Sequence, residues 1–233
     1  METVETPAPS TTDKARVFLV EDHPVVRHGL ATLIDDEPDL AVCGGAESMK
    51  DALAQIRRLK PDVAVIDITL GDGSGLDLIK QIHEDRPKMP LLALSMHDEA
   101  VYAERALRAG AKGYIMKKEA MDKVMTAIRK VLAGELYVSE RMSARMVQKL
   151  VNPEGAGTIS PTEVLSDREF EVFRLIAQGI GPSEIASRLE VSVKTIESHQ
   201  QRLKQKLDVR STAELRNRAA RSRQVGEKHV SSV

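Results

Sequence analysis

The sequence has no tryptophan, only three phenylalanines and three tyrosines, and a single cysteine, Cys43. One cysteine excludes an intramolecular disulfide framework and a cysteine-rich zinc module, so a cytoplasmic protein with Cys43 in its core is expected. The scarcity of aromatic side chains argues against binding of RNA or single-stranded DNA by base stacking. No stretch approaches the roughly 18 apolar residues that a membrane span needs, and the N-terminus is polar, so neither export nor membrane insertion is expected.

Neither sign of charge dominates the whole chain, which has a formal net charge of −1, but the charges are unevenly distributed. Residues 192–228 include ten lysines and arginines against four acids, a net charge of +6, which leaves −7 for the remainder. A basic end on an acidic body indicates a polyanionic partner for that end alone. Because RNA and single strands are disfavoured, duplex DNA is the leading candidate.

Length and composition indicate a globular chain of one or two domains, since 42% of its 233 residues are hydrophobic and 30% are charged. Between Arg16 and Gly134, short apolar runs alternate with patterns of helical length. This alternation predicts a flavodoxin-like α/β domain, in which five helices cover a parallel sheet of five strands. The predicted strands are Val17–Val20, Leu40–Cys43, Val63–Ile66, Leu91–Leu94 and Gly113–Met116.

Beyond this region the pattern becomes helical. Ser139–Leu150 can form one amphipathic helix, and Val151–Thr162 has no periodicity and several breakers, which indicates a linker. Further helix starts are signalled by Ser166 with Glu169, Gly181 with Pro182, Ser192, and Ser211 with Glu214. The expected organisation is a disordered N-terminus (1–14), the α/β domain (15–136), a linker with one helix (137–162), an all-α domain (163–223) and a loose tail (224–233).

Acidic residues follow two of the predicted strands. Glu21 and Asp22 come directly after the first strand, and Asp67 comes after the third. If these strands are neighbours, three carboxylates meet at one sheet edge, and an all-oxygen site with room for water suits Mg²⁺. The next strands end at Ser95 and Lys117. A carboxylate nucleophile, a hydroxyl, an ammonium group and a metal together indicate a phosphoryl site.

Taken singly, each of these residues has an ordinary structural explanation as a turn, surface or core residue, but their order along successive strand ends argues against coincidence. The glycine-rich segment Gly71–Gly75 lacks the lysine of a phosphate-binding loop and is interpreted as a turn. The histidines show no metal-ligand spacing and are expected to be surface or capping residues: His23, His28, His83 and His97.

From Arg16 to about Leu136 the sequence resembles the receiver domains of two-component response regulators. Segments Glu21–Pro24 and Ala109–Lys118 are similar to the NarL/FixJ subgroup in particular. Two positions depart from the common pattern, because Gly71 and Lys118 stand where many receivers carry proline. The resemblance implies these roles: Glu21 and Asp22 as the acidic metal pair, Asp67 as phospho-acceptor, Thr69 as metal ligand through its backbone carbonyl, Ser95 as switch hydroxyl, Tyr114 as switch aromatic, which turns inward on phosphorylation, and Lys117 as the invariant lysine.

The basic end has the layout of a helix-turn-helix, with helices at Pro182–Leu189 and Val193–Leu207 joined by the short turn Glu190–Ser192. One face of the second helix is apolar and is predicted to be core: Val193, Ile196, Leu203 and Leu207. The opposite face carries cations, amides and a hydroxyl, the groups that contact phosphates and base edges in the major groove: Lys194, Ser198, Gln201, Arg202 and Gln205.

Two further residues of this helix leave alternatives open. Glu197, at the margin of the polar face, either accepts a hydrogen bond from a cytosine amine or orients Lys194 or Arg202. His199 lies nearer the core and is expected to be packed or bound to phosphate.

The segment Val164–Ala220 resembles the LuxR-type DNA-binding domain, notably at Glu184–Ala186 and Thr195–Ile196. Gly181–Pro182 departs from the serine-asparagine common in that family, but glycine followed by proline starts a helix equally well. The resemblance implies that the last helix, Ser211–Arg221, mediates dimerisation through Leu215 and Ala219. The candidate DNA-contact residues are Lys194, Thr195, Glu197, Ser198, His199, Gln201, Arg202 and Gln205.

The expected function is a DNA-binding transcriptional response regulator that a sensor histidine kinase phosphorylates at Asp67 with Mg²⁺. The resemblance implies promoter DNA, RNA polymerase and a phosphorylation-induced homodimer as partners, with no membrane partner. One alternative is a magnesium-dependent phosphatase, although Thr69 stands where such an enzyme carries a second acid. Another is a DNA-binding protein whose receiver responds to a ligand or partner instead of phosphorylation.

Overall fold

The computed structural model describes residues 14–71, 73–96, 99–151, 164–189 and 191–228. The predicted disordered N-terminus (except Lys14), the predicted linker from 152 onward and the end of the predicted tail lie outside these ranges. The chain divides into two compact units, Met1–Met146 and Val147–Val233. In the described ranges no helix is both long enough and apolar enough to cross a membrane.

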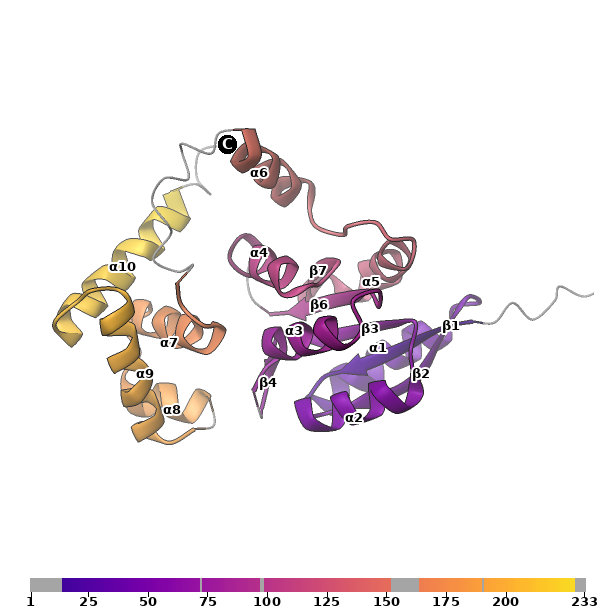
Figure 1. Cartoon of the computed structure of the whole chain (residues 1–233), viewed down its shortest axis with the longest axis horizontal. Coiled ribbons are helices and arrows are strands. Elements are labelled where there is room, and N and C mark those ends of the chain that lie inside the picture. Colours follow the sequence, from indigo (N-terminus) through magenta and orange to yellow (C-terminus); the bar gives the residue numbers. More distant parts are fainter. Residues whose placement is uncertain (1–13, 72, 97–98, 152–163, 190, 229–233) are drawn as a thin grey trace, which may run out of the picture. The chain divides into compact units, whose positions relative to one another are not determined.

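The first unit is built on a five-stranded parallel sheet (Figure 1). Its strands are β1 (Ala15–Val20), β2 (Leu40–Ala46), β3 (Val63–Asp67), β6 (Leu91–Ser95) and β7 (Gly113–Met116). The order β2-β1-β3-β6-β7 makes β1 and β3 neighbours. This is the arrangement that brings the acidic residues after these two strands together. The predicted α/β fold is therefore confirmed, with each strand within three residues of its predicted bounds.

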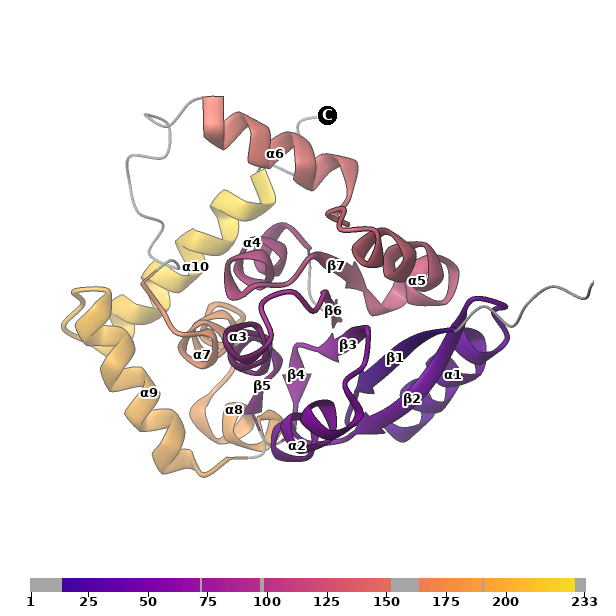
Figure 2. The same ribbon diagram turned by 45° about the vertical axis from the view of Figure 1, so that its right-hand side comes forward.

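Helices cover both faces of this sheet, and the connections follow the βα alternation read from the sequence (Figure 2). They are α1 (Pro24–Asp35), α2 (Met49–Leu59), α3 (Gly75–Asp85), α4 (Glu99–Ala109) and α5 (Lys117–Leu132). Alternate strand residues such as Val17, Leu19 and Val65 form one buried cluster with α1 and α5. The other face packs against α2, α3 and α4. Burial on both faces explains why the strands are almost continuously apolar.

One expectation for this unit is confirmed in part and another is wrong. Gly71 lies in a turn, but β4 (Thr69–Leu70) and β5 (Gly73–Ser74) pair antiparallel on either side of it and Gly75 already begins α3. Cys43 is only half-buried, since β2 is an edge strand of the sheet. Burial nevertheless raises the pKa of the Cys43 thiol.

The segment after α5 remains associated with the first unit. Tyr137 forms a parallel bridge to Gly113 at the edge of the sheet, and α6 (Glu140–Val151) follows. This helix confirms the amphipathic helix predicted over Ser139–Leu150. The division between the two units falls inside it, after Met146.

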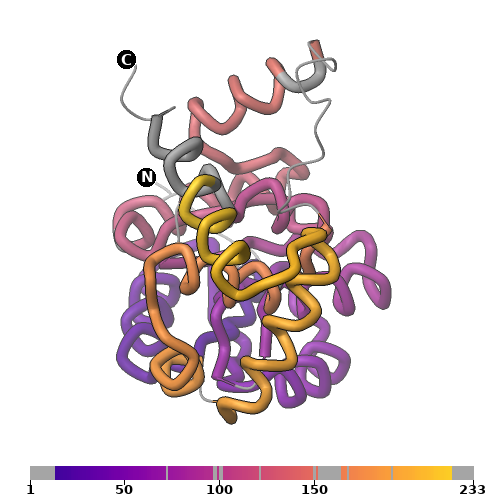
Figure 3. Tube along the Cα trace, turned by 90° about the vertical axis from the view of Figure 1, so that its left-hand side faces the viewer, coloured from indigo at the N-terminus to yellow at the C-terminus, as the bar shows by residue number. Residues whose placement is uncertain are grey.

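The second unit contains four described helices, which are coloured orange to yellow in Figure 3. They are α7 (Asp167–Ala177), α8 (Pro182–Arg188), α9 (Val193–Lys206) and α10 (Thr212–Lys228). All four predicted starts are confirmed. Ser166 and Glu169 form a reciprocal capping box, Gly181 precedes Pro182 at the start of α8, and Ser192 and Ser211 accept hydrogen bonds from the amides of Thr195 and Glu214.

Two boundary expectations for this unit need correction. Val193 is 40% exposed instead of buried, because it is the first residue of α9, whereas Ile196, Leu203 and Leu207 are core as predicted. The helix α10 continues to Lys228, so five residues of the predicted loose tail are helical. Its only breaker there is Gly226, which weakens a helix by about 1 kcal/mol and does not end it.

Candidate functional site

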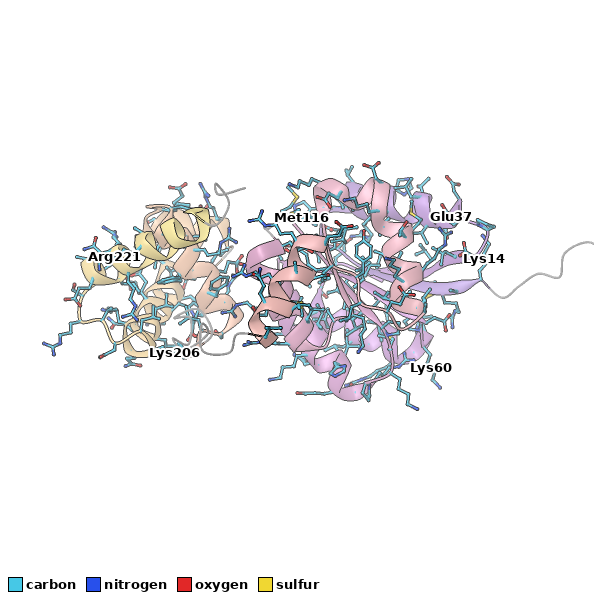
Figure 4. The ribbon with its side chains drawn as sticks, turned by 90° about the horizontal axis from the view of Figure 1, so that it is seen from above. Lys14, Glu37, Lys60, Met116, Lys206 and Arg221 are labelled. Atoms are coloured by element: carbon cyan, nitrogen blue, oxygen red, sulfur yellow. The ribbon has the colours of Figure 1, made fainter. Side chains whose placement is uncertain are left out.

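The acidic residues and Lys117 meet at the carboxyl ends of three strands. Glu21 follows β1, Asp67 is the last residue of β3, and Lys117 follows Met116, the end of β7 that is labelled in Figure 4. Lys117 Nζ donates to Glu21 Oε1 and Asp67 Oδ2, each at 2.9 Å, and lies 2.7 Å from Glu21 Oε2. Both carboxylates are about 1% exposed. The ammonium group thus holds together two buried like charges from separate strands.

Asp22 completes the acidic group on its open side, and His23 joins it. The Asp22 side chain is partly exposed, and His23 Nδ1 lies 2.6 Å from Asp22 Oδ1 and 3.1 Å from Glu21 Oε1. The carboxylate of Asp22 raises the pKa of His23. His23 is a surface residue at the N-cap of α1, as expected, but its ring makes no capping bond and contacts the acids instead. Its position directly after the acidic pair was the available signal for this contact.

Burial dominates the electrostatics of Asp67 but not those of Lys117. It raises the pKa of Asp67 to about 6, although Lys117 pulls the other way. Burial also disfavours the Lys117 ammonium, but Asp67 and hydrogen bonds to Glu21 and Asp67 outweigh this effect and raise the pKa of Lys117. At pH 7.5 Asp67 is therefore mostly ionised, although burial disfavours its charged form. A carboxylate in this environment is suited to act as a nucleophile.

The hairpin after β3 holds the Asp67 side chain in place. The Thr69 amide donates to Asp67 Oδ1 at 3.2 Å, and the Gly75 amide donates to the Ile68 carbonyl at 2.7 Å. A Cβ atom on Gly75 would lie only 1.9 Å from the Asp67 carbonyl oxygen, so only glycine allows this close approach. The hairpin thus holds Asp67 with one oxygen toward Lys117 and the other toward Thr69.

The two expected switch residues are both buried. Ser95 ends β6, one position beyond Leu94, the residue that pairs with Asp67. Tyr114 lies in the middle of β7 and is 1% exposed. Tyr114 therefore already occupies the inward position that was expected only on phosphorylation.

The donor set fits a hard divalent cation. Ligand atoms of Glu21, Asp22, His23 and Asp67 all lie within 4.8 Å of one another. Carboxylate oxygens are the ligands that Mg²⁺ prefers, and the partial exposure of Asp22 leaves one side open to the waters that this ion retains. Thr69 contacts this cluster through its amide, which donates to Asp67 Oδ1.

The second candidate site is the polar face of α9. Six of the proposed DNA-contact side chains on this face are exposed: Lys194, Glu197, Ser198, Gln201, Arg202 and Gln205. Thr195 is half-buried, and its hydroxyl lies 2.8 Å from that of Ser192 at the helix start. The polar face therefore lies outside the core that Ile196 and Leu203 enter.

His199 is half-buried, as expected for a residue near the core edge. Its Nδ1 atom is buried and finds no hydrogen-bond partner among the described residues. Burial, together with the charges of Arg168 and Arg202, lowers the pKa of His199. A neutral, partly packed ring follows from this environment.

An ion pair between an exposed lysine and a buried carboxylate anchors the end of α9, and it was not predicted from the sequence. Glu169, only 3% exposed, accepts hydrogen bonds from the Ser166 amide at 2.8 Å and from Lys206 Nζ at 2.7 Å. Burial favours its neutral form, but these hydrogen bonds outweigh burial and lower the pKa of Glu169. Lys206, labelled in Figure 4, therefore has a structural role as the partner of Glu169. The two residues are 37 positions apart, so no local pattern pointed to this pair.

The two residues expected to mediate dimerisation lie in the core of their own domain. Leu215 and Ala219 are both 0% exposed, because α10 packs against α7 and α9 through this face. The apolar stripe of α10 serves the core of its own domain. The exposed face of α10 carries other residues: Ala213, Glu214, Arg216, Asn217, Arg218, Ala220 and Arg221.

This combination of a parallel α/β domain with acids and a lysine at its strand ends and a helix-turn-helix domain defines a class of signal-controlled DNA-binding regulators. Residues 17–129 match the response regulator receiver domain, and residues 163–219 match the luxR family of bacterial regulatory proteins. The chain belongs to the two-component response regulators of the NarL/FixJ subfamily. This family consists of transcription regulators, which excludes the phosphatase alternative.

Several characterised proteins are similar over most of their length. Oxygen regulatory protein NreC of Staphylococcus haemolyticus is 36% identical over 204 residues, covering 86% of this chain and 94% of that protein. NreC of Staphylococcus aureus is 37% identical with the same coverage. Among solved structures, RcsB of Salmonella enterica serovar Typhimurium, bound to promoter P1flhDC in the presence of phosphomimetic BeF3⁻, is 26% identical with a TM-score of 0.57 and covers 89% of this chain and 98% of that one.

Proposed function

We propose that Asp67 accepts a phosphoryl group from a sensor histidine kinase and that this modification controls promoter binding by the second unit. The observation that carries the proposal is the contact of one buried lysine, Lys117, with both Asp67 and Glu21 at adjoining strand ends. Asp67 is held at both oxygens and is largely ionised at neutral pH. Its free electron pairs are thus available for attack on phosphorus, while Lys117 neutralises charge on the transferred oxygens.

Glu21, Asp22 and Asp67 are the residues that would hold Mg²⁺, with the Thr69 carbonyl as the further ligand that the family pattern implies. When bound, this ion supplies positive charge beside the phosphoryl oxygens. Ser95 is proposed to rearrange when the phosphoryl group, which carries close to two negative charges, is added, whereas Tyr114 already occupies the inward position. A cytoplasmic location follows from the proposed kinase and DNA partners.

The acceptor is tested by incubating the full chain with a small phosphodonor and Mg²⁺ and measuring the intact mass. We expect the wild type to gain one phosphoryl group and Asp67→Asn to gain none. Asp85→Asn is a matched control, because Asp85 pairs with Arg57 on the surface of the same unit. Equal labelling of Asp67→Asn and the wild type would show that another residue is the acceptor.

For the second unit we propose that α9 enters the major groove of promoter DNA and that phosphorylated chains bind as a homodimer, from which they act on RNA polymerase. The structures of RcsB bound to promoter P1flhDC and to DNA support this proposal by analogy. Because Leu215 and Ala219 are buried, the dimer contact of α10 is assigned to its exposed face. Dimeric binding predicts two half-sites about 34–36 Å apart, which selection of bound sequences from a random pool would reveal.

A further inference from the structure

The start of α6 is attached to the first unit at the strand that carries Tyr114. After α5, the chain returns to the sheet edge, where the Tyr114 amide donates to the Tyr137 carbonyl at 2.8 Å and the Tyr137 amide donates to the Lys112 carbonyl at 2.9 Å. The Tyr137 ring packs against the cluster formed with α1 and α5. The first residues of the segment that leads to the second unit are therefore fixed in place.

The cap of α6 is completed by a residue from another helix. Ser139 Oγ accepts a hydrogen bond from the Met142 amide at 3.1 Å, as expected of an N-cap residue. In a capping box, the residue three positions on returns a carboxylate to the N-cap amide. That position holds Met142, which has no acceptor of this kind. Glu99 takes over this role, since its Oε1 accepts from the Ser139 amide at 2.7 Å.

The contrast with α7 shows that this arrangement is unusual within the chain. There Ser166 and Glu169 belong to the same helix, so the cap forms wherever α7 forms. In α6 the carboxylate lies 40 positions away and is the first residue of α4. The start of α6 therefore depends on the position of α4.

The position of α4 is in turn tied to the phosphoryl site. Glu99 follows Ser95, the end of β6, by four positions along the chain. An N–H···O hydrogen bond weakens beyond about 3.2 Å, so a displacement of Glu99 by roughly half an ångström is enough to lose the bond to Ser139. A rearrangement of Ser95 that displaced Glu99 by this amount would therefore open the cap of α6.

We propose that Glu99 is a positioning residue whose bond to the Ser139 amide holds the first turn of α6 in the unmodified protein, and that phosphorylation of Asp67 releases it. This inference rests on the proposed function of Asp67. Release frees the helix in which the two units of the chain are joined. The phosphorylation state of the receiver is thereby communicated to the segment that leads to the DNA-binding unit.

The test is hydrogen exchange of the full chain, with and without BeF3⁻ and Mg²⁺ as a phosphoryl mimic. In the wild type we expect exchange of the amides of residues 139–143 to become about fivefold faster on addition of the mimic, the effect of losing one capping bond. In Glu99→Ala these amides should exchange fast from the start and no longer respond. Glu99→Gln keeps an acceptor oxygen and should restore most of the protection and of the response.

Glu104→Ala is the matched control, because Glu104 lies in the same helix and pairs with Arg108 within it. It should respond like the wild type. Asp67 labelling by a small phosphodonor is measured on the same preparations. If Asp67 is not labelled, the proposed function fails. If Asp67 is labelled but residues 139–143 do not respond, or Glu99→Ala behaves like the wild type, the role of Glu99 is refuted while the phosphoryl site stands.

Discussion

The two units use charge in opposite ways. In the first unit, Glu21, Asp67 and Lys117 are buried at the end of a sheet and compensate one another at 2.7–2.9 Å. In the second unit, Glu169 is the one polar residue that is fully buried among the described residues, and the side chains on the polar face of α9, such as Lys194, Gln201 and Arg202, are exposed. Charged and polar side chains are therefore proposed to form a reactive site in one unit and a binding surface in the other.

The difference shows what burial contributes to each role. Removing one partner of a buried ion pair lowers the free energy of unfolding by several kcal/mol. The stability of the first unit therefore responds strongly when a single group is modified. Exposed pairs are worth about 0–1 kcal/mol and are screened by salt, which suits reversible contact with a polyanion. Changing one group at a time in each unit tests this contrast, and the expected effects decrease from the buried cluster to the exposed helix.

The largest effect is expected for Lys117→Met. It leaves the carboxylates of Glu21 and Asp67 buried side by side without a cation, which should reduce the free energy of unfolding by about 3–5 kcal/mol at pH 7 in EDTA. Denaturant unfolding of the full chain measures this change. Added Mg²⁺ should recover more stability in the variant than in the wild type.

Lys123→Met is the control, since Lys123 is an exposed lysine that pairs with Glu119 within α5. It should leave the unfolding curve almost unchanged. Equal effects of the two substitutions would show that burial does not distinguish Lys117.

The second prediction concerns the apolar interior of the DNA-binding unit. Leu215→Ala removes a fully buried side chain and should destabilise this unit by about 3 kcal/mol, because the cavity adds to the lost burial of the side chain. Thermal unfolding should show the transition of this unit shifted down, while Arg216→Ala on the exposed face leaves it in place. A variant Leu215→Ala that kept its stability and lost only dimerisation would restore the interpretation that the sequence favoured.

The third prediction follows from the pKa of Asp67, which burial raises from 3.8 to about 6. The folded state therefore prefers the protonated carboxyl, and this contribution to stability is complete below about pH 4 and is lost as the pH rises through 6. Asp67→Asn should accordingly be more stable than the wild type by about 2 to 3 kcal/mol at pH 7.5 without Mg²⁺. The difference should shrink to near zero at pH 4, as unfolding curves across this range would show. A constant difference would mean that Asp67 does not titrate in this window.

The elements of both units and their caps were largely predictable from the sequence, because the signals that specify them are local. Apolar runs gave the strands, and pairs such as Ser166 with Glu169 gave the helix starts. The acidic cluster was predictable because strands of a parallel sheet end on the same edge. Lys117 was placed correctly for the same reason.

The errors arise where a distant partner decides the outcome. Periodicity shows that one face of α10 is apolar, but not that α7 and α9 cover Leu215. Two contacts join residues that are far apart in the sequence, namely Glu99 with Ser139, 40 positions apart, and Glu169 with Lys206, 37 positions apart. No local sequence pattern indicates such a pair. Val193 has the right period for the core, yet the helix start leaves it exposed.

The smallest effects are expected on the exposed face of α9, where each side chain is replaceable. Lys194→Ala should weaken binding to every DNA sequence and make the negative slope of log affinity against log salt shallower by about 0.9, since one phosphate contact is lost. Gln201→Ala should change the salt dependence little and relax the preference at one base pair, by about 1–3 kcal/mol at most. Lys80→Ala, an exposed lysine on α3, controls for the change in net charge. Selection from a random DNA pool at several salt concentrations separates the two variants, and an unchanged preference in Gln201→Ala would show that another face of α9 reads the bases.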